Sequence, residues 1–425
     1  MMARSVTLFT LAAFLAVVAL ASIVGCASTG KKAPTQTGPI PEIRALVGEE
    51  AASFVVESKG GFRVESESGM ALMRSNDPSR ISVRRQGSLV ELRFEPQGTA
   101  AVAEGSVYIT PFKSSNLIYN GVSYPGRLFA LVGSVGPLYV INVLPLETYL
   151  EGVLPHEIGD PGPDAYAALQ AQAITARTYA MTRIQSRKDE PFDVYASVRD
   201  QVYGGKNDAN RLATGAVRET RGVVLTFKDK LAQTNYFATC GGHTSDIRLV
   251  WPQREPARYL YGLYDRGAPG DKSFCTWVHN YRWRYSFSGK ELGRILRKTI
   301  PAELGADPST IGSLVDIGVS ERNPSGRARY LEIITTKGTF TVEGDRIRWV
   351  LMADIDAGRI LPSTMFELHK ESQNGLLSFV SIIGGGNGHG VGMCQNGAIG
   401  MAKGGYTYEM ILSHYYPGTR LAKRY

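Results

Sequence analysis

The first long segment of this chain consists of short stretches in which apolar and polar residues alternate, broken by turns. From Glu42 to about Tyr139, short runs such as FVVES, FRVES and LVELRF are separated by turn residues. A period of two is typical of half-buried antiparallel strands. Asn120-Gly121, between LIY and VSY, predicts a hairpin turn. Because no helical period occurs in this segment, we expect residues 42–139 to form a β-rich N-terminal region.

Two helical patterns follow. Leu146, Leu150 and Val153 keep helical spacing, and we expect this helix to end near Pro155. The second helix is rich in small residues that allow close packing; these are Ala168, Ala171, Ala173, Ala176 and Ala180. Further strands and helices alternate to the end of the chain. The sequence therefore predicts an α+β fold, in which the β-rich region precedes an α+β domain over residues 140–425.

The beginning of the chain has the pattern of an export signal. Arg4 precedes an apolar run, Leu8 to Val24, that is followed by Gly25 and Cys26. This end resembles a bacterial lipobox. The resemblance implies a lipoprotein signal peptide over residues 1–25, a lipid on Cys26 and a flexible tether over residues 26–41. An ordinary secretory signal and an uncleaved anchor are the alternatives, and on the lipobox interpretation the protein is exported and anchored to the membrane at the cell envelope.

Composition agrees with a folded, exported protein of more than one domain. The chain has 425 residues, of which 43% are hydrophobic and 20% charged, so it can bury sizeable cores. Its net charge of +8 is spread along the chain. This charge either only keeps the protein soluble or favours the binding of anionic partners, such as cell-wall polymers and lipid head groups. Because no basic cluster has interleaved aromatic residues, we expect no nucleic-acid partner.

Glu157 is the strongest candidate for catalysis. It lies between the two helical patterns and is flanked by Leu154 and Ile158. Partial desolvation of a carboxyl group raises its pKa and keeps it protonated near neutral pH, as a general acid requires. The alternative is a capping or surface glutamate.

Two later segments carry polar residues suited to ligand binding. In the sequence DQVYGG, Gln201 offers hydrogen bonds to a hydroxyl-rich ligand and Tyr203 an aromatic face, although the segment equally suits a turn that satisfies its own backbone. Near the end, GGGNGHGVGMCQNGA contains His389 and Gln395. His389 would donate a hydrogen bond to a ligand or fix the loop. The segment lacks the residues of a phosphate-binding loop, so nucleotide binding is not expected.

The cysteines leave three alternatives. Cys240 is followed by His243, and Cys275 by His279, a spacing that could hold zinc. The same cysteines could form a disulfide or remain free thiols. Export favours oxidation and therefore the disulfide over zinc, and in each bridging case Cys240 and Cys275 must lie close together.

Five motifs occur in an order that resembles one family, the stage II sporulation protein D family with its relatives called amidase enhancers. They are VLPLETYLEGVLPHEIG, ALQAQAITARTYA, DQVYGG, CGGHTSD and GHGVGMCQNGAIGMAKGGYTYEMILSHYYPGT. The resemblance covers roughly residues 143–419. It implies a lytic transglycosylase that cuts peptidoglycan between N-acetylmuramic acid and N-acetylglucosamine, on glycan strands stripped of peptides.

The resemblance also implies roles for single residues. The catalytic acid of the family falls on Glu157, and supporting, substrate-binding roles fall on Arg177, Gln201, Tyr203, His389 and Gln395. Cys394 is a departure, because relatives commonly carry serine there.

The chemistry agrees with one catalytic carboxylate. Ordinary glycosidases need two. In a transglycosylase the C6 hydroxyl of the sugar attacks the anomeric carbon, so one glutamate can first donate and then accept a proton, giving a 1,6-anhydro end. The nearby Glu147 and Glu151 are interpreted as solvated or capping residues.

A different class of function stays open at this point. Amidase enhancers stimulate a peptidoglycan amidase without cutting glycan, and a purely structural wall-binding lipoprotein would bind without forming product. In both cases Glu157 would be structural. Product formation by the purified protein distinguishes these alternatives from the enzyme.

Overall fold

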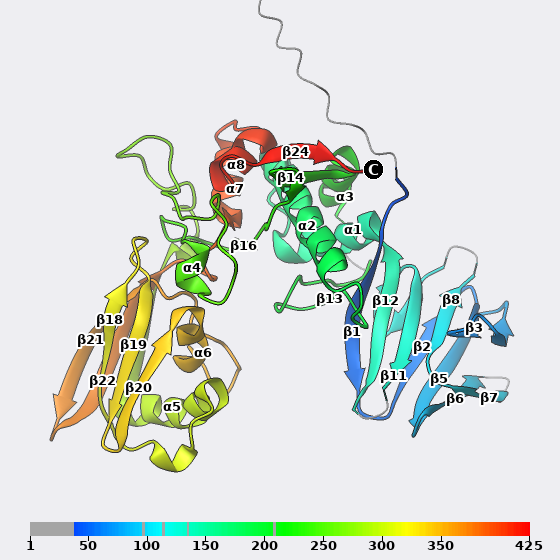
Figure 1. Cartoon of the computed structure of the whole chain (residues 1–425), viewed down its shortest axis with the longest axis horizontal. Coiled ribbons are helices and arrows are strands. Elements are labelled where there is room, and N and C mark those ends of the chain that lie inside the picture. Colours follow the sequence, from blue (N-terminus) through cyan, green and yellow to red (C-terminus); the bar gives the residue numbers. More distant parts are fainter. Residues whose placement is uncertain (1–37, 96–97, 113–114, 134–135, 207–209) are drawn as a thin grey trace, which may run out of the picture. The chain divides into compact units, whose positions relative to one another are not determined.

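A computed structural model describes residues 38–95, 98–112, 115–133, 136–206 and 210–425 (Figure 1). The predicted signal peptide, Cys26 and the tether up to residue 37 lie outside these ranges. Within them, no helix is both long enough and apolar enough to cross a membrane.

The predicted β-rich region consists of two sheets that share one hydrophobic core. The first has the order β13-β1-β12-β11-β8-β3-β4, and the second has the order β10-β9-β2-β5-β6-β7. Apart from the parallel pair β1 and β13, neighbouring strands are antiparallel. The strands are β1 (Glu42–Glu50), β2 (Ser53–Ser58), β3 (Phe62–Ser66), β4 (Ala71–Ser75), β5 (Ser79–Gln86), β6 (Leu89–Glu95), β7 (Ala100–Glu104), β8 (Val107–Pro111), β9 (Leu117–Tyr119), β10 (Val122–Tyr124), β11 (Arg127–Val132), β12 (Leu138–Pro145) and β13 (Val194–Tyr195).

Alternation decides which side chains enter this core. In β2, Phe54 and Val56 are buried, and in the neighbouring β5 Ile81 and Val83 are buried, as a period of two requires. The predicted hairpin is confirmed, because β9 pairs with β10 across Asn120 and Gly121, which both have positive φ. The expected region boundary at residue 139 falls inside β12.

The first predicted helix is α1 (Leu146–Glu157), which follows β12 directly. Its buried side chains, among them Leu150 and Val153, join the core of the two sheets. The helix ends at Glu157, two residues after Pro155 and so near the expected end. Proline removes one backbone donor, but the backbone N–H of Ile158 still donates to the carbonyl oxygen of Leu154 at 3.0 Å. Glu157 is therefore the last residue of a helix anchored in the β core.

The small-residue helix is α2 (Tyr166–Ser186), and it lies at the centre of the mixed part of the chain. It contacts α1, α3 (Arg211–Glu219), α7 (Gln395–Lys403), α8 (Tyr408–Tyr415) and β14 (Val223–Phe227). Alanines with fully buried side chains, such as Ala171 and Ala176, allow this close packing. Strand β14 lies between β15 (Lys230–Leu231) and β24 (Arg420–Lys423), while β16 (Tyr236–Phe237) pairs in parallel with β23 (Met393–Cys394). Short helices η1 (Pro163–Ala165) and α4 (Ile247–Val250) complete this part.

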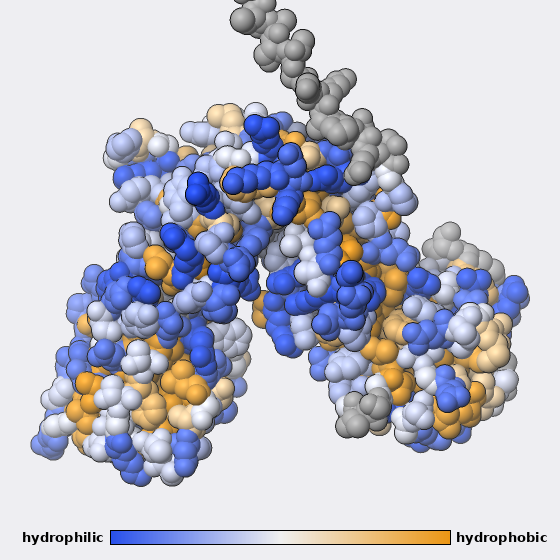
Figure 2. Space-filling model, in the orientation of Figure 1, coloured by the Kyte–Doolittle hydropathy of each residue, from blue (hydrophilic) through white to orange (hydrophobic). Residues whose placement is uncertain are grey.

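A separate core forms between residues 279 and 385. Two three-stranded sheets, β17-β22-β21 and β18-β19-β20, surround it together with α5 and α6. The elements are η2 (His279–Tyr281), β17 (Arg282–Ser288), α5 (Gly289–Leu304), η3 (Pro308–Thr310), β18 (Leu314–Arg322), β19 (Ala328–Thr335), β20 (Gly338–Glu343), η4 (Gly344–Arg346), α6 (Ile347–Val350), β21 (Phe366–Gln373) and β22 (Leu376–Gly385). The α+β fold is thus confirmed. On the face shown in Figure 2, hydrophilic residues are spread over the described parts of the chain and do not gather in one patch.

Candidate functional site

Glu157 occupies a half-buried position at the C-terminal end of α1. Its Oε1 atom accepts a hydrogen bond of 2.7 Å from the backbone N–H of Val202. Burial raises the pKa of the Glu157 carboxyl from 4.5 to about 7, although hydrogen bonds from Val202, Tyr236 and Gln395 act in the opposite direction. Desolvation is therefore the dominant effect, and near neutral pH the group is present in both protonation states.

Tyr236 and Gln395 approach this carboxyl from two neighbouring segments, at the paired strands β16 and β23. Tyr236 begins β16, and Gln395 is the first residue of α7, directly after β23. Gln395 is only 6% exposed. Its amide lowers the pKa of Glu157, yet its Nε2 has no hydrogen-bond partner of ordinary geometry within the described part of the chain. A buried amide with an unused donor beside a carboxyl is a group that a ligand would satisfy.

Gln201 orients Tyr236. Its Nε2 donates to the Tyr236 hydroxyl oxygen at 3.0 Å, and its Oε1 accepts from the Tyr149 hydroxyl at 3.3 Å. The Gln201 side chain is completely buried. Gln201 therefore orients the Tyr236 hydroxyl, and its own side chain is not exposed to a ligand.

His389 fixes the backbone of the same tyrosine. Its Nδ1 accepts from the Val391 N–H at 3.1 Å, so its Nε2 carries the hydrogen and donates to the carbonyl oxygen of Tyr236 at 3.0 Å. The ring lies against Trp251, with centroids 4.7 Å apart. Burial lowers the pKa of His389 to about 4, so the imidazole is neutral at physiological pH. Through its bond to the Tyr236 carbonyl oxygen, the neutral imidazole of His389 holds β16.

Arg177 and Tyr203 point into the interior. The Arg177 guanidinium is fully buried and forms two bonds, of 2.7 and 2.8 Å, to the carboxylate of Glu147. The Tyr203 hydroxyl donates to Asn142 at 2.8 Å, and the ring packs against Tyr149. Neither side chain is available to a ligand in this structure. The interpretation of Glu147 as a solvated or capping residue is also incomplete. Its partner, the buried Arg177, lies 30 residues away in the sequence, so no local pattern indicates the pair.

Asn235, the residue before Tyr236 in the sequence, lines a pocket of about 340 Å³. Tyr179, Arg183 and Arg254 line the same pocket. Arg183 is paired with Asp200 at 3.1 Å, whereas Arg254 has no ion pair within the described ranges. The pocket therefore offers a guanidinium to an anionic ligand.

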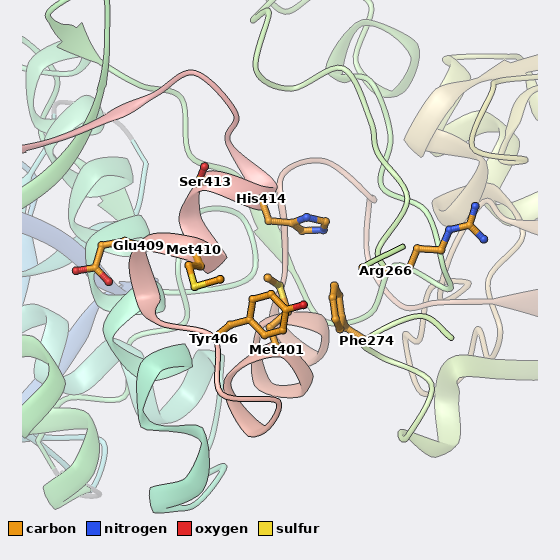
Figure 3. A pocket seen from close by; sticks show the side chains of 9 residues that line it. Arg266, Phe274, Met401, Tyr406, Glu409, Met410, Ser413 and His414 are labelled. Carbon is orange, nitrogen blue, oxygen red and sulfur yellow. The ribbon is translucent and has the colours of Figure 1, made fainter. Parts of the chain in front are cut away.

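A second pocket is separate from these residues. Figure 3 shows it between the side chains of Arg266 and Phe274 and those of helices α7 and α8. Met401, Tyr406, Met410 and His414 form much of its wall, and none of the candidate site residues lines it.

The cysteines lie together, as both bridging alternatives require. The Sγ atoms of Cys240 and Cys275 are 3.4 Å apart. Neither histidine of the expected zinc set belongs to this group: His243 faces the carbonyl of Thr244, and the ligand atoms nearest the two cysteines are those of Cys394 and Asp265.

Sequence reasoning missed Tyr236 and Asp265. Tyr236 stands in an ordinary strand pattern, TNYFAT, and Asp265 in a long irregular loop. Tyr236 lies four residues before the motif CGGHTSD, whereas no pattern in the sequence singles out Asp265.

Comparison with known proteins supports the family. Residues 135–227 match the family described as stage II sporulation protein, and residues 272–392 match a domain of unknown function. An uncharacterised protein of Brachyspira hyodysenteriae is 32% identical over 88% of this chain and 91% of its own length. The amidase enhancer of Bacillus subtilis is 27% identical over 64% of this chain but only 40% of its own length, and stage II sporulation protein D of the same organism is 27% identical over 67% of this chain and 76% of its own. With the ordered motifs and the arrangement around Glu157, these matches show that the chain belongs to the stage II sporulation protein D and amidase enhancer family.

Proposed function

We propose that this protein is an exported lytic transglycosylase of peptidoglycan in which Glu157 is the single acid and base. The observation that carries the proposal is the half-buried Glu157 carboxyl, whose pKa is raised to about 7. No second carboxylate is among the main causes of that shift. An ordinary hydrolytic glycosidase would need a second acidic residue at the site.

In the proposed reaction, the protonated Glu157 first donates its proton to the oxygen that links N-acetylmuramic acid to N-acetylglucosamine. The bond from this oxygen to the anomeric carbon then breaks. The C6 hydroxyl of the same muramic acid attacks the anomeric carbon and gives its proton to the Glu157 carboxylate. No water is consumed, the product has a 1,6-anhydro end, and the acid is regenerated. A pKa near 7 suits a group that must donate and accept in turn.

The neighbours of Glu157 suit this cycle. The Val202 N–H donates to the carboxyl at 2.7 Å and holds it in place. Hydrogen bonding by Tyr236 and Gln395 favours the ionised form, which keeps the pKa near neutrality despite burial. The Gln395 Nε2 carries two hydrogens and has no partner of ordinary geometry in the described residues, so it can also donate to a sugar hydroxyl or acetamido oxygen.

The pocket lined by Asn235 and Arg254 suggests which form of the substrate is preferred. Removing the stem peptide from muramic acid leaves a free lactyl carboxylate. In this pocket the Arg254 guanidinium stacks on the Trp251 ring at 4.2 Å and has no carboxylate partner within the described residues. Carboxylate recognition by arginine therefore supports a preference for peptide-stripped strands. In this proposal a lipid on Cys26 holds the protein at the membrane, and the glycan strand is its main partner.

The name of one relative favours a second candidate. A protein called an amidase enhancer matches 64% of this chain, so stimulation of a peptidoglycan amidase is the alternative function. The alternative requires no chemistry at Glu157.

One digest tests both. Purified protein is incubated with intact and with peptide-stripped peptidoglycan, and the soluble products are analysed by mass spectrometry. We expect 1,6-anhydro muramic ends, mainly from stripped strands. Absence of such ends, together with faster release of peptides by an added amidase, would establish the enhancer alternative instead.

A further inference from the structure

Three cysteines and one aspartate converge inside the protein. The ligand atoms of Cys240, Asp265, Cys275 and Cys394 all lie within 4.8 Å of one another, and all four residues are buried. The Cys240 Sγ is 3.4 Å from the Cys275 Sγ and 3.0 Å from the Asp265 Oδ2. Four such donors at these spacings can surround one tetrahedral ion, since Zn–S bonds are about 2.3 Å and Zn–O bonds about 2.0–2.2 Å long.

Hydrogen bonds already hold these donors as a metal site requires. The Cys240 sulfur accepts from the Gly242 N–H at 3.2 Å, and the Cys394 sulfur accepts from the Gly397 N–H at 3.2 Å. The Tyr415 hydroxyl donates to the other carboxylate oxygen, Oδ1 of Asp265, at 2.5 Å. This bond leaves Oδ2 directed at the cysteines. Outer contacts of this kind orient ligands and stabilise thiolate charge.

A buried arginine provides independent support. Arg327 is fully buried, and its guanidinium donates to the carbonyl oxygens of Cys240, at 2.8 Å, and His243, at 2.7 Å. No carboxylate forms an ion pair with it in the described ranges of the chain. A buried cation without a counter-charge is costly. Three thiolates, a carboxylate and a divalent ion carry a net charge of −2, which would compensate this guanidinium.

A metal ion at this site would also stabilise a long irregular loop. Asp265 and Cys275 lie in the stretch from residue 251 to 278, which contains almost no regular secondary structure, and such loops are uncommon without other support. Cys240 follows β16 and Cys394 ends β23. One ion would tie this loop to the strand pair that carries Tyr236 and Gln395.

We propose that Cys240, Asp265, Cys275 and Cys394 bind a structural zinc ion. Thiolates select zinc over hard cations such as magnesium and calcium. Because the protein fills all four positions, the ion has no open position for substrate or water, and it stabilises the site without taking part in the chemistry. This inference holds whether the protein cuts glycan or stimulates an amidase.

Metal content and thiol state test the proposal on the purified full-length protein. Elemental analysis should give about one zinc per chain. Alkylation should leave the three cysteines unmodified in the native protein, and should modify each of them after denaturation with a chelator and without reductant. Peptide mapping reports each cysteine separately, so Cys26 does not interfere.

Variants locate the ligands. Asp265→Asn and Cys394→Ser should weaken zinc affinity by at least the ten- to hundredfold that loss of outer contacts alone produces. The matched control is His243→Ala, which should retain zinc. Cobalt substitution of the wild type gives a second readout, because tetrahedral thiolate coordination produces intense visible absorption. A chain that contains no zinc and is two hydrogens lighter, with Cys240 joined to Cys275, would overturn the proposal in favour of a disulfide. Three freely alkylated thiols in the native protein without metal would overturn it as well.

Discussion

Replacing Glu147 by glutamine should destabilise the protein far more than its place in the first turn of a helix suggests. The Arg177 guanidinium is 0% exposed, and Glu147 supplies its only carboxylate within the described residues, through two bonds of 2.7 and 2.8 Å. Glutamine keeps one acceptor, turns an N–H₂ group towards the guanidinium and removes the negative charge. Breaking a buried pair from one side costs about 3–5 kcal/mol. Because the Glu147 side chain keeps 13% exposure, we expect about 3 kcal/mol.

Glu151→Gln is the matched control. Glu151 lies one helical turn further along α1 and pairs at 3.2 Å with Arg218, whose side chain is 72% exposed. Pairs of this kind contribute less than about 1 kcal/mol. Urea unfolding followed by far-ultraviolet circular dichroism measures both variants, and hydrogen exchange of peptides from α1 and α2 shows where the loss occurs. Equal stabilities of the two variants, within about 0.5 kcal/mol, would refute the reasoning.

Three further predictions concern the site and its anchor. Because the pKa of Glu157 is raised to about 7, the carboxyl is protonated below that pH and ionised above it. The rate of transglycosylation should therefore fall as the pH rises through about 7. A constant rate up to pH 9 would contradict the assignment. Tyr236→Phe removes a hydroxyl that lowers this pKa, so the alkaline limb of the pH–rate profile should move to higher pH, whereas an unchanged or lower limb would show that the hydroxyl does not act on the carboxyl. Cys26→Ser should release the protein from the membrane fraction, and unprocessed protein that stays there with unchanged migration would contradict the lipoprotein interpretation.

The sequence predicted the strands well because alternation is a local property. Phe54 and Val56 are buried, and Ile81 and Val83 of the paired strand are buried with them, as their spacing indicates. The end of α1 was predicted to within two residues. Pro155 removes one backbone donor, and the helix ends two residues later, at Glu157.

Site residues could be predicted only where the evidence for them lies close by in the sequence. Glu157 was found from its apolar neighbours and its family motif. Arg177 stands in a motif of the same family, yet its role depends on Glu147, which no local pattern connects to it. The metal-ligating group joins residues as far apart as Cys240 and Cys394, which are 154 positions apart in the sequence. The pairing of β16 with β23 brings their segments together, and the Cys240 N–H donates to the Cys394 sulfur at 3.2 Å.

The central claim is that Glu157 is the sole acid and base, and the Glu157→Gln variant tests it most directly. Glutamine keeps the shape of the side chain and its carbonyl oxygen can still accept from the Val202 N–H, but it has no transferable proton. Release of 1,6-anhydro products from peptide-stripped glycan should fall by about a hundred- to ten-thousandfold, while glycan binding is retained and Glu151→Gln releases product at the wild-type rate. Wild-type product release by Glu157→Gln would contradict the account.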